Sequence, residues 1–396
     1  MEWRQSKIKP MASTPNIRLA DPGNYPLRKV LREDGKGLLK SAGKEHLPSD
    51  EKLLEIYRAM LTTRILDDRM LKLQRQGRVG FVGLATGQEA AIHGSAAAFG
   101  KDDWIFSALR EGGVTIQRGM SINDYIAHMF GNDEDSAKGR QMPNHFQCKE
   151  VNFPSWSSVL GTQLPHAVGA ALAMKMRKQP SVCAAYTGDG ATSSNGFHSA
   201  MNMAAVNKAP VVFVIVDNGW AISVPSSKQT ASESYGAKAK AYGMPGVNVD
   251  GNDPLASYQA VSEAIERDKN GEGPSLVALR TYRLGGHSSS DDPTKYRNED
   301  EVSEWQKRDP LPRLEAYLKS SGLYEKEGVA DWESQITDQV AAAVSHAEDV
   351  GPPKLETLVE DVYANPPQHL RKQVIEALRL VAEKGAADAV AGKFPL

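Results

Sequence analysis

Two short apolar runs constrain the fold of this chain more than any other feature of its sequence. The runs "SVCAAYTG" (181–188) and "APVVFVIVDN" (209–218) lack the apolar–polar alternation of half-exposed strands, which predicts strands covered on both faces. Between them, residues 196–207 have the length and composition of a helix. A β-α-β unit of this kind predicts two parallel strands joined by a helical crossover.

A second unit of the same kind follows. "GVNVDGND" and "PSLVALRTYR" are predicted strands, and 254–268 between them is a predicted helix. We therefore expect an α/β fold with a parallel, doubly wound sheet flanked by helices. A further helix is predicted over 47–77, with Ser49 or Asp50 as its N-cap and Gly77 at its end.

The chain is predicted to have three regions. Residues 1–48 are polar, contain proline and lack periodicity, which indicates an N-terminal arm. Residues 49–300 form the α/β domain. Residues 301–396 are a C-terminal helical region that packs on the same domain, with predicted helices at 301–322, 331–348 and 366–392.

The composition excludes several classes of protein. The net charge of −2 gives no reason to expect a nucleic-acid or anionic-membrane partner. No apolar run approaches the ~20 residues of a membrane helix, and no apolar signal region stands near the N-terminus. The two cysteines, Cys148 and Cys183, indicate reduced thiols. We expect a soluble intracellular protein.

Polar residues follow each of the first two predicted strands. Asp189 follows one strand and Asn218 the next, and 26 residues separate Gly190 from Asp217, which is enough for one helical crossover. Ligands of open parallel sheets bind beyond the carboxyl ends of the strands. Carboxylate, amide and carbonyl oxygens suit Mg²⁺, which borrows further ligands from phosphates.

The glycines of "GDG" have a consistent interpretation. Gly188 and Gly190 leave room for a diphosphate to approach the backbone, and the helix beginning near Gly196 points its N-terminus at the same place. The alternative is that "GDG" is a turn and "DNG" a loop, because each motif alone is weak. The pair at this spacing is more specific.

The spacing of these two motifs resembles the thiamine-diphosphate signature. The surrounding chain resembles the α subunit of the branched-chain 2-oxo acid dehydrogenase E1 component over roughly residues 50–380. The segments that carry the likeness are "RQGRVGF", "GKGRQMPNHFQCKE", "SSVLGTQLPHAVGAALA", "VDGNDPLASY", "TYRLGGHSSSDDPTKYR" and "DVYANPPQHLRKQ". Pyruvate dehydrogenase α subunits share the diphosphate motif, but "RQMPNHF" and "SSSDDPTKYR" are closer to the branched-chain type.

The resemblance implies a set of cofactor-binding residues. Asp189, Asn218 and the backbone carbonyl of Trp220 would hold Mg²⁺, and Gly188, Gly190 and Ala191 would lie close to the diphosphate of thiamine diphosphate. Arg110 would pair with a phosphate oxygen, for which a planar guanidinium is well suited. His287 would lie near the diphosphate and the reacting carbons, as the catalytic residue that handles protons.

Other residues are assigned to the far side of the cofactor by the same resemblance. Ser158 and Leu160 would line the cofactor, and Leu160 would lie near its reactive ring. Ser157, Thr162 and Gln163 resemble a potassium site. Phe81, with Leu160, would contribute to an apolar pocket for a branched substrate side chain. Ser288 stands where mitochondrial relatives carry a regulatory phosphoserine.

The resemblance also implies an activity and partners. The activity is oxidative decarboxylation of branched-chain 2-oxo acids with reductive acylation of lipoyl groups on an E2 acyltransferase. No segment for binding the cofactor's pyrimidine is visible, so a β subunit would complete the site in an α₂β₂ heterotetramer. The small-residue segment 163–178 is a candidate for close subunit packing, or else an ordinary buried helix. A bacterial cytoplasm is expected, with the mitochondrial matrix as the alternative.

Three positions depart from the family pattern. Leu109 stands where relatives commonly have Tyr, Val216 where one mitochondrial relative has a phosphate-contacting Arg, and Trp220 where Tyr is usual. These departures keep open a scaffold subunit whose diphosphate site has decayed. Pyruvate or acetoin dehydrogenase α is the alternative enzyme. A nucleotide-binding α/β module is disfavoured, because neither G-x-G-x-x-G after a strand nor G-x-x-x-x-G-K-[ST] is present.

Overall fold

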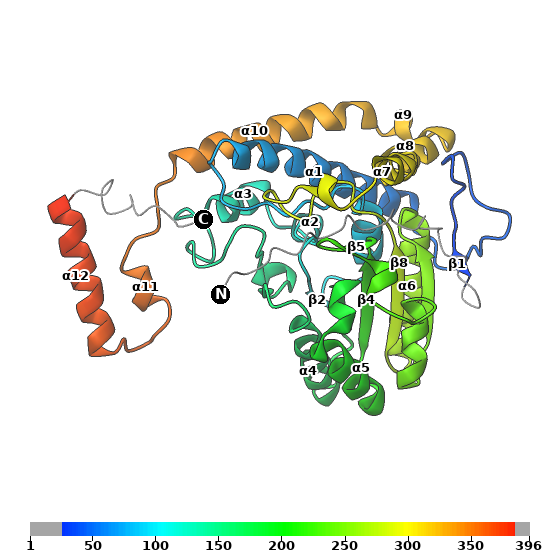
Figure 1. Ribbon diagram of the computed structural model, residues 1–396, viewed down its shortest axis with the longest axis horizontal. Helices are drawn as coiled ribbons and strands as arrows, with labels where there is room; N and C mark the ends of the chain where they lie inside the picture. The colour runs from blue at the N-terminus through cyan, green and yellow to red at the C-terminus, as the bar shows by residue number, and fades with distance from the viewer. Residues whose placement is uncertain (1–25, 385–396) are drawn as a thin grey trace, which may run out of the picture.

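The computed structural model describes residues 26–384, and its centre is a six-stranded sheet in which all neighbouring strands are parallel (Figure 1). The strand order is β1-β7-β8-β4-β3-β2. The strands are β1 (Leu27–Arg28), β2 (Trp104–Phe106), β3 (Cys183–Gly188), β4 (Val211–Asp217), β7 (Gly246–Asp250) and β8 (Ser275–Arg280). The predicted α/β fold with a parallel sheet is confirmed.

The central strand β4 is buried on both faces, as its unbroken apolar run predicted. Val212 and Val214 belong to one hydrophobic cluster, whereas Phe213 and Ile215 belong to another. Side chains of a strand alternate between the faces of a sheet, so the two clusters are the two faces. Because parallel strands are buried on both sides, each face needs a layer of helices.

Helices cover both faces, so the sheet is doubly wound. The cluster that contains Val212 is shared with α1 (Asp50–Arg75), α6 (Pro254–Lys269) and α10 (Trp332–Asp349). The opposite cluster is shared with α4 (Gln163–Met176) and α5 (Asn195–Asn207). The predicted helices over 47–77, 163–178, 196–207 and 254–268 are all present, with ends shifted by a few residues.

Helix α1 begins and ends where its sequence signals indicated. The Ser49 hydroxyl accepts a hydrogen bond from the amide of Lys52, which makes Ser49 the N-cap. Gly77, just beyond the helix, has a φ of 75°, a conformation that glycine adopts without steric cost. These contacts fix both ends of the longest helix of the domain.

The remaining elements are short. Helices α2 (Gly113–Gln117) and α3 (Ile122–Phe130) follow β2, and strands β5 (Trp220–Ala221) and β6 (Val224–Pro225) form a hairpin after β4. Ala90–Gly94 is a single π-helical turn. The 3₁₀ turns are Lys149–Val151, Gly190–Ser193, Ser226–Lys228, Gly236–Tyr242, Pro293–Lys295 and Val329–Asp331.

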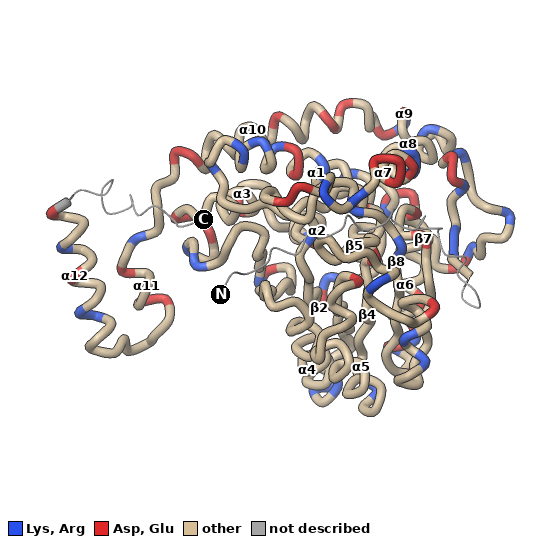
Figure 2. Tube along the Cα trace, in the orientation of Figure 1, with Lys and Arg blue, Asp and Glu red and all other residues tan. Residues whose placement is uncertain are grey.

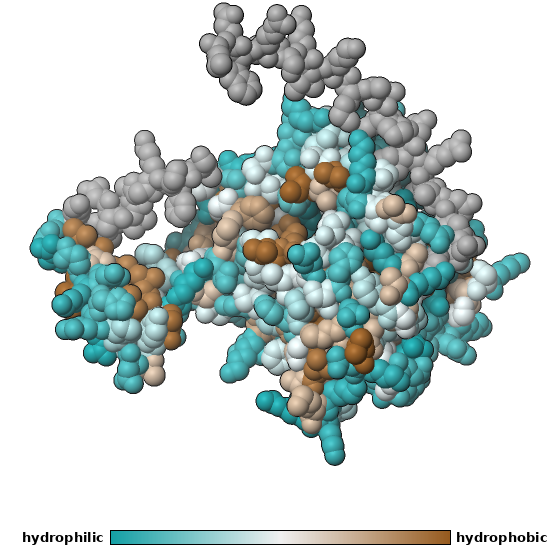
Figure 3. Space-filling model, turned by 60° about the horizontal axis from the view of Figure 1, so that its bottom comes forward, coloured by the Kyte–Doolittle hydropathy of each residue, from teal (hydrophilic) through white to brown (hydrophobic). Residues whose placement is uncertain are grey.

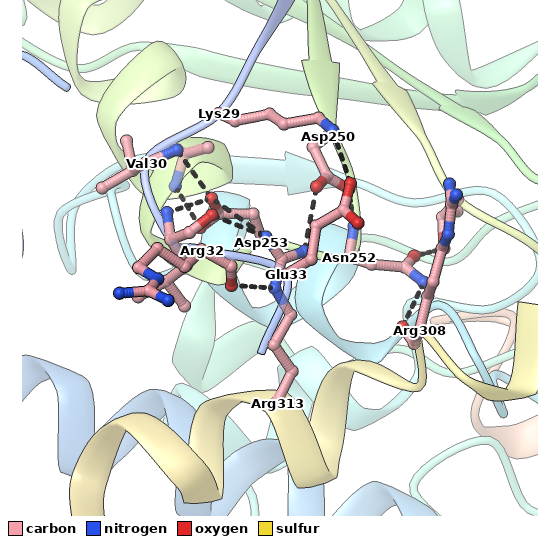
Figure 4. Close-up of polar contacts among 12 residues, drawn as sticks. Lys29, Val30, Arg32, Glu33, Asp250, Asn252, Asp253, Arg308 and Arg313 are labelled. Carbon is pink, nitrogen blue, oxygen red and sulfur yellow. Dashed lines mark hydrogen bonds and ion pairs between the residues drawn. The ribbon is translucent and has the colours of Figure 1, made fainter. Parts of the chain in front are cut away.

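The predicted arm of residues 1–48 differs from the structure in its second half. Leu27–Arg28 forms the edge strand β1, paired with β7, and Val30 and Leu31 are completely buried. The Asp253 carboxylate accepts hydrogen bonds from the amides of Val30 and Leu31, at 2.7 and 2.6 Å (Figure 4). Contacts between segments more than 200 residues apart carry no local sequence signal. Residues 1–25 lie outside the described part of the chain.

The Arg313 guanidinium completes this attachment from the C-terminal region. It lies on α8 (Pro310–Ser320) and donates to the Asp250 carboxylate at 2.9 Å, to the Leu31 carbonyl at 2.8 Å and to the Arg32 carbonyl at 3.1 Å (Figure 4). The segment after β1 and helix α8 are therefore joined beside the carboxyl end of β7.

The C-terminal helical region is divided more finely than the sequence predicted. The predicted helix 301–322 is two helices, α7 (Glu299–Gln306) and α8, because Pro310 cannot continue a helix and Asp309 caps a new one. The first turn of α7 is acidic, which suits the positive end of its dipole (Figure 2). A short helix α9 (Leu323–Lys326) leads to α10.

Of the last two helices, α12 (Gln368–Lys384) stands away from the α/β domain, whereas α11 (Thr357–Glu360) is bonded to the domain through Arg140 (Figure 1). The two helices form a lobe with hydrophobic residues on its surface (Figures 1 and 3). The prediction had the whole region 301–396 packing on the domain. Helices α8 and α10 belong to its hydrophobic core, and α11 is bonded to the domain by Arg140, which donates to the Thr357 carbonyl and to the Asp361 carboxylate. The predicted end of the last helix, 385–392, lies outside the described residues.

Candidate functional site

The candidate site lies at the carboxyl ends of β3 and β4. Strand β3 ends at Gly188, whose register partner on β4 is Val216. The next residues in each strand direction, Asp189 and Asp217, are therefore neighbours at this edge, and Asn218 follows directly. Parallel pairing thus brings together the two motifs that the sequence singled out.

Asp189 and Asp217 are two buried carboxylates that share one hydroxyl. The Ser226 hydroxyl lies 3.2 Å from Asp189 Oδ2 and 3.0 Å from Asp217 Oδ1. The Gln229 amide donates to Asp189 at 2.6 Å. Burial and the charge of Asp217 raise the pKa of Asp189 to about 6, and burial also raises the pKa of Asp217. A hydroxyl has one proton, so it cannot satisfy both carboxylates at once.

Asn218 and Trp220 present oxygen atoms at the same edge. The Asn218 side-chain amide donates to Gln88 Oε1 at 2.8 Å, which fixes the orientation of its carbonyl oxygen, and that oxygen accepts from the Trp220 amide at 3.2 Å. The Trp220 carbonyl accepts from Arg283 at 3.2 Å. Amide and backbone carbonyl oxygens have two lone pairs each, so both keep capacity for a cation.

The two glycines of the motif have different surroundings. A Cβ atom at Gly188 would meet nothing within 4 Å, whereas one at Gly190 would lie 2.5 Å from the Ala221 Cβ. Gly190 is therefore required by the packing of the β5–β6 hairpin. The helix predicted to begin near Gly196 is confirmed, because α5 begins at Asn195 after its N-cap Ser194, and the 3₁₀ turn Gly190–Ser193 separates it from the end of β3. Ala191 lies buried inside that turn.

Arg110, which is buried, and His287, which is partly buried, form a pair on the other side of the site. Arg110 donates to the carbonyl of Leu84 and, at 3.0 Å, to the carbonyl of His287. Its guanidinium also lies 3.4 Å from His287 Nδ1. Since the guanidinium can only donate, His287 Nδ1 is the acceptor and the imidazole proton is on Nε2.

The charges of this pair are strongly perturbed. Burial and the nearby Arg110 and Arg283 lower the pKa of His287 to about 4. Burial and Arg283 lower the pKa of Arg110 to about 10. Part of this effect on Arg110 is offset by buried carboxylates, those of Asp67, Glu111 and Asp189. An anionic ligand would further stabilise the charged guanidinium of Arg110.

An apolar wall lies beside Arg110 and His287. A Cβ at Gly83 would lie 3.3 Å from the Leu109 side chain and 3.6 Å from the Phe81 side chain. Both side chains therefore lie beside the backbone of Gly83. The neighbouring Val82 exchanges hydrogen bonds with Ser289. Phe81 and Leu109 are only partly buried, so a ligand can reach them.

The segment around Ser158 is exposed. Leu160 is 40% and Val159 67% exposed, and the Ser158 hydroxyl lies 2.5 Å from His145 Nε2. Of the predicted potassium ligands, Ser157 and Thr162 both bond the backbone of Val159. The Ser157 hydroxyl accepts from its amide, and the Thr162 hydroxyl donates to its carbonyl. Gln163 lies apart, because its side chain bonds the Gly161 amide and the Tyr186 carbonyl.

Sequence reasoning missed several residues that shape this site. These are Gln88, Ser226, Gln229, Arg283 and His145. Gln88 stands in the Gly- and Ala-rich stretch "GLATGQEAAIHGSAAAFG", a composition that indicates tight packing near a ligand and is a usable signal. Arg283, completely buried, stands three residues after the end of β8. Ser226 and Gln229 had no local signal.

The oxygen atoms at the sheet edge fit a hard cation. Within residues 26–384, no three His, Cys, Asp or Glu side chains gather as a metal site, so a cation here would rely on amide and carbonyl oxygens besides Asp189. The neutral donors Ser226 and Gln229 leave the negative charge of Asp189 and Asp217 in place. A divalent cation would offset that charge, so the residues present suit Mg²⁺.

Comparison with known proteins identifies the family. The profile of the family described as "Dehydrogenase E1 component" matches residues 57–356. The chain belongs to this family. Membership implies the use of thiamine diphosphate, whose diphosphate agrees with the buried cation at Arg110 and with the oxygen ligands for a metal ion.

Several named relatives are similar over most of the chain. The 2-oxoisovalerate dehydrogenase subunit alpha of Bacillus subtilis is 43% identical, covering 76% of this chain and 91% of that protein. The mitochondrial subunit alpha 2 of Arabidopsis thaliana is 40% identical, covering 92% and 77% respectively. The mitochondrial subunit alpha of Homo sapiens is 39% identical, covering 88% and 78%. The relatives thus include bacterial and mitochondrial proteins.

The described residues contain no helix with the length and hydropathy needed to cross a membrane.

Proposed function

We propose that this chain is the α subunit of a branched-chain 2-oxo acid dehydrogenase E1 component (3-methyl-2-oxobutanoate dehydrogenase). The enzyme uses thiamine diphosphate for the oxidative decarboxylation of branched-chain 2-oxo acids. It then transfers the acyl group to lipoyl groups on an E2 acyltransferase by reductive acylation. One observation carries the proposal. Asp189 and Asn218 on one side, and Arg110 and His287 on the other, surround the edge of the sheet in a chain 38–43% identical to 2-oxoisovalerate dehydrogenase α subunits.

The cofactor would be held by groups with matched charge. Asp189, the Asn218 amide oxygen and the Trp220 carbonyl would bind Mg²⁺, and Arg110 would bind an oxygen of the diphosphate. When bound, thiamine diphosphate supplies the electron sink that decarboxylation of a 2-oxo acid requires. A potassium ion would be bound by Ser157 and Thr162, which both hydrogen-bond to the backbone of Val159. Gln163 would join them by giving up its hydrogen bond with the Gly161 amide.

The remaining residues would orient the substrate and move protons. His287 carries its proton on Nε2, because Arg110 occupies Nδ1, and Nε2 is the atom that would donate toward a bound substrate. The apolar wall of Phe81, Leu109 and Leu84 would accept a branched aliphatic side chain and exclude water from it. Leu160, exposed here, would cover the substrate from the opposite side.

The chain would form half of a two-chain active site. The partner is a β subunit in an α₂β₂ heterotetramer, which would serve a lipoyl-bearing E2. Two surfaces support a partner subunit. Ile375 of α12 is 66% exposed, and the small residues Gly169 and Ala173 of α4 face outward. Cell fractionation of the source organism would decide between bacterial cytoplasm and mitochondrial matrix.

Two of the three departures from the family pattern bear on the scaffold alternative. Val216 is 3% exposed and packs in the hydrophobic core, so no cation could act from that position without leaving the core. Leu109 extends the apolar wall. Neither change disturbs Asp189, Asn218, Arg110 or His287, and so the enzyme is favoured over the scaffold.

Isothermal titration of thiamine diphosphate with Mg²⁺ tests the proposal. We expect binding to the chain co-expressed with its β partner, and loss of at least about tenfold in affinity for Asp189→Ala, since a charge-assisted contact is removed. Asp338→Ala, at an exposed helical position, is the matched control. If the folded wild-type protein binds no cofactor, the scaffold subunit replaces the enzyme as the favoured function.

Substrate comparison separates the enzyme alternatives. We expect kcat/KM for 3-methyl-2-oxobutanoate to exceed that for pyruvate by about tenfold or more, because two further methyl groups would be buried against the apolar wall. A preference for pyruvate would assign the chain to the pyruvate or acetoin type.

A further inference from the structure

One turn of the chain attaches the exposed segment around Ser158. This turn, residues 141–145, bonds the segment 155–160 at three points. The Gln141 amide donates to the Ser155 hydroxyl at 3.2 Å, and the Trp156 indole donates to the Asn144 carbonyl at 2.6 Å. The third point is the His145–Ser158 contact at 2.5 Å. The residues Ser157 to Leu160 are otherwise exposed, so their position depends on this attachment.

His145 is fixed for this role by its surroundings. Its ring is 5% exposed and stacks on Trp156, with ring centres 4.0 Å apart and planes inclined by 10°. Its Nδ1 lies 3.2 Å from the Pro143 carbonyl, which can only accept, so Nδ1 carries the proton. Nε2 is therefore the acceptor, and the Ser158 hydroxyl donates to it.

The direction of this hydrogen bond decides what Ser158 can offer a ligand. Because the hydroxyl proton is committed to His145, Ser158 Oγ presents only lone pairs to the site. A ligand group that meets Ser158 Oγ must then be a hydrogen-bond donor, such as an amino group. Burial lowers the pKa of His145, which favours the neutral ring that this arrangement needs.

The same turn also holds the opposite wall of the site. Asn144 Oδ1 accepts from the Gly83 amide at 2.9 Å, and its side-chain amide faces the Gly83 carbonyl at 3.4 Å. Gly83 precedes Leu84, whose carbonyl accepts from Arg110. The 141–145 turn therefore joins the 155–160 segment to the backbone that anchors Arg110.

We infer that His145 is a positioning residue that, as a neutral imidazole, holds Ser158 and the 155–160 segment in place for the cofactor. The inference rests on the proposed function for the identity of the ligand. The attachment itself is a property of this chain and is measurable without any ligand.

Hydrogen exchange of the complex with the β partner, without cofactor, is the primary test. His145→Phe retains a ring to stack on Trp156 but removes the acceptor. We expect the amides of Val159 and Gly161, which are bonded locally, to exchange about tenfold faster, as loss of one hydrogen bond predicts. Peptides covering 81–84 should keep wild-type exchange, since Asn144 is unchanged.

Three further variants separate positioning from general damage. Ser158→Ala should reproduce the exchange of His145→Phe, and the double variant should add nothing, because both remove one contact. His145→Gln supplies an acceptor and should restore part of the protection. His166→Gln, at an exposed site on α4, is the control. If His145→Phe unfolds, the Ser158→Ala and His145→Gln results still decide the question.

Titration of thiamine diphosphate with Mg²⁺ into the same proteins links the attachment to the site. We expect about tenfold weaker binding for His145→Phe, with partial recovery in His145→Gln. Wild-type exchange at Val159 and Gly161 in both His145→Phe and Ser158→Ala would overturn the inference. Wild-type protein that binds no cofactor would instead refute the proposed function, because the exchange result does not depend on it.

Discussion

At the scale of single residues, Asp268 is an unpaired buried carboxylate in α6. Its side chain is 5% exposed, neither carboxylate oxygen has a hydrogen-bond partner, and burial raises its pKa to about 8. The folded pKa exceeds the unfolded value, so the protonated form stabilises the fold. This stability is fully present below about pH 4 and is lost as pH rises through about 8.

The substitution Asp268→Asn should remove this loss of folding stability at high pH. We expect the variant to be more stable than wild type at pH 8.5 by on the order of 2 kcal/mol, with a smaller difference at pH 5. Denaturant midpoints at the two pH values measure the effect. Asp338→Asn, at an exposed position, is the control and should show no such pH dependence. Equal midpoints for wild type and Asp268→Asn at pH 8.5 would contradict the prediction.

At the scale of elements, Asp253 joins two parts of the chain. One carboxylate oxygen caps α6 by accepting from the amides of Leu255 and Ala256, and the other accepts from Val30 and Leu31 (Figure 4). Loss of an N-cap costs about 1 kcal/mol, and each buried amide left unpaired costs about 1–3 kcal/mol more. The Asp253 carboxylate therefore holds the amides of the segment after β1, whose carbonyls are held by Arg313.

Asp253→Ala should destabilise the protein by about 3 kcal/mol or more and expose residues 26–33 to protease. Ser121→Ala removes a single exposed cap, that of α3, and should cost only about 1 kcal/mol. Urea unfolding and limited proteolysis measure the two effects. Similar costs for the two variants would mean that the contacts of Asp253 with Val30 and Leu31 add nothing.

At the scale of the whole molecule, helix α12 exposes apolar side chains, whereas its neighbour α11 is bonded to the domain through Arg140. Ile375 is 66% exposed and Leu378 37%, on a helix in contact with α11 but separate from the domain (Figures 1 and 3). Full burial of such side chains stabilises by about 1.5–3 kcal/mol each. A partner subunit that covers them would recover that free energy.

Ile375→Lys should weaken assembly with the β subunit at least about tenfold, while leaving the unfolding midpoint of the α chain unchanged. Gln373→Lys adds the same charge two residues away, on another face of the helix, and should have little effect. Analytical ultracentrifugation of the co-expressed pair measures assembly. Unchanged assembly for Ile375→Lys would exclude this face of α12 from the interface.

Four strands of the sheet, β3, β4, β7 and β8, and the long helices of the domain followed from local sequence signals, whereas the short strand β2 did not. The apolar runs of β3 and β4, the cap at Ser49 and the glycine after α1 each act within a few residues, so sequence alone located them. The break between α7 and α8 was missed although Asp309 and Pro310 signal it, because the amphipathic pattern continues across it. Strand β1 was missed because two residues give no periodicity.

The candidate site divides in the same way. Asp189 and Asn218 follow predicted strands at a spacing that suggested a diphosphate and a metal ion, and the resemblance to the E1 family assigned Arg110 and His287 to the same site. The roles of Gln88 and Arg283 depend on side chains that meet across more than 60 residues of chain. No pattern within a window of sequence encodes such contacts.

The sequence by itself determined the class of fold, the parallel strands and the position of the ligand edge, because strand burial and turn chemistry are local properties. Only the tertiary structure decided which groups share that edge. It placed the Ser226 hydroxyl within hydrogen-bond distance of the carboxylates of Asp189 and Asp217. It also placed the His287 imidazole beside the Arg110 guanidinium, and His145 within hydrogen-bond distance of Ser158. Hydrogen bonds and pKa values depend on distances between atoms, and those distances exist only once the chain has folded.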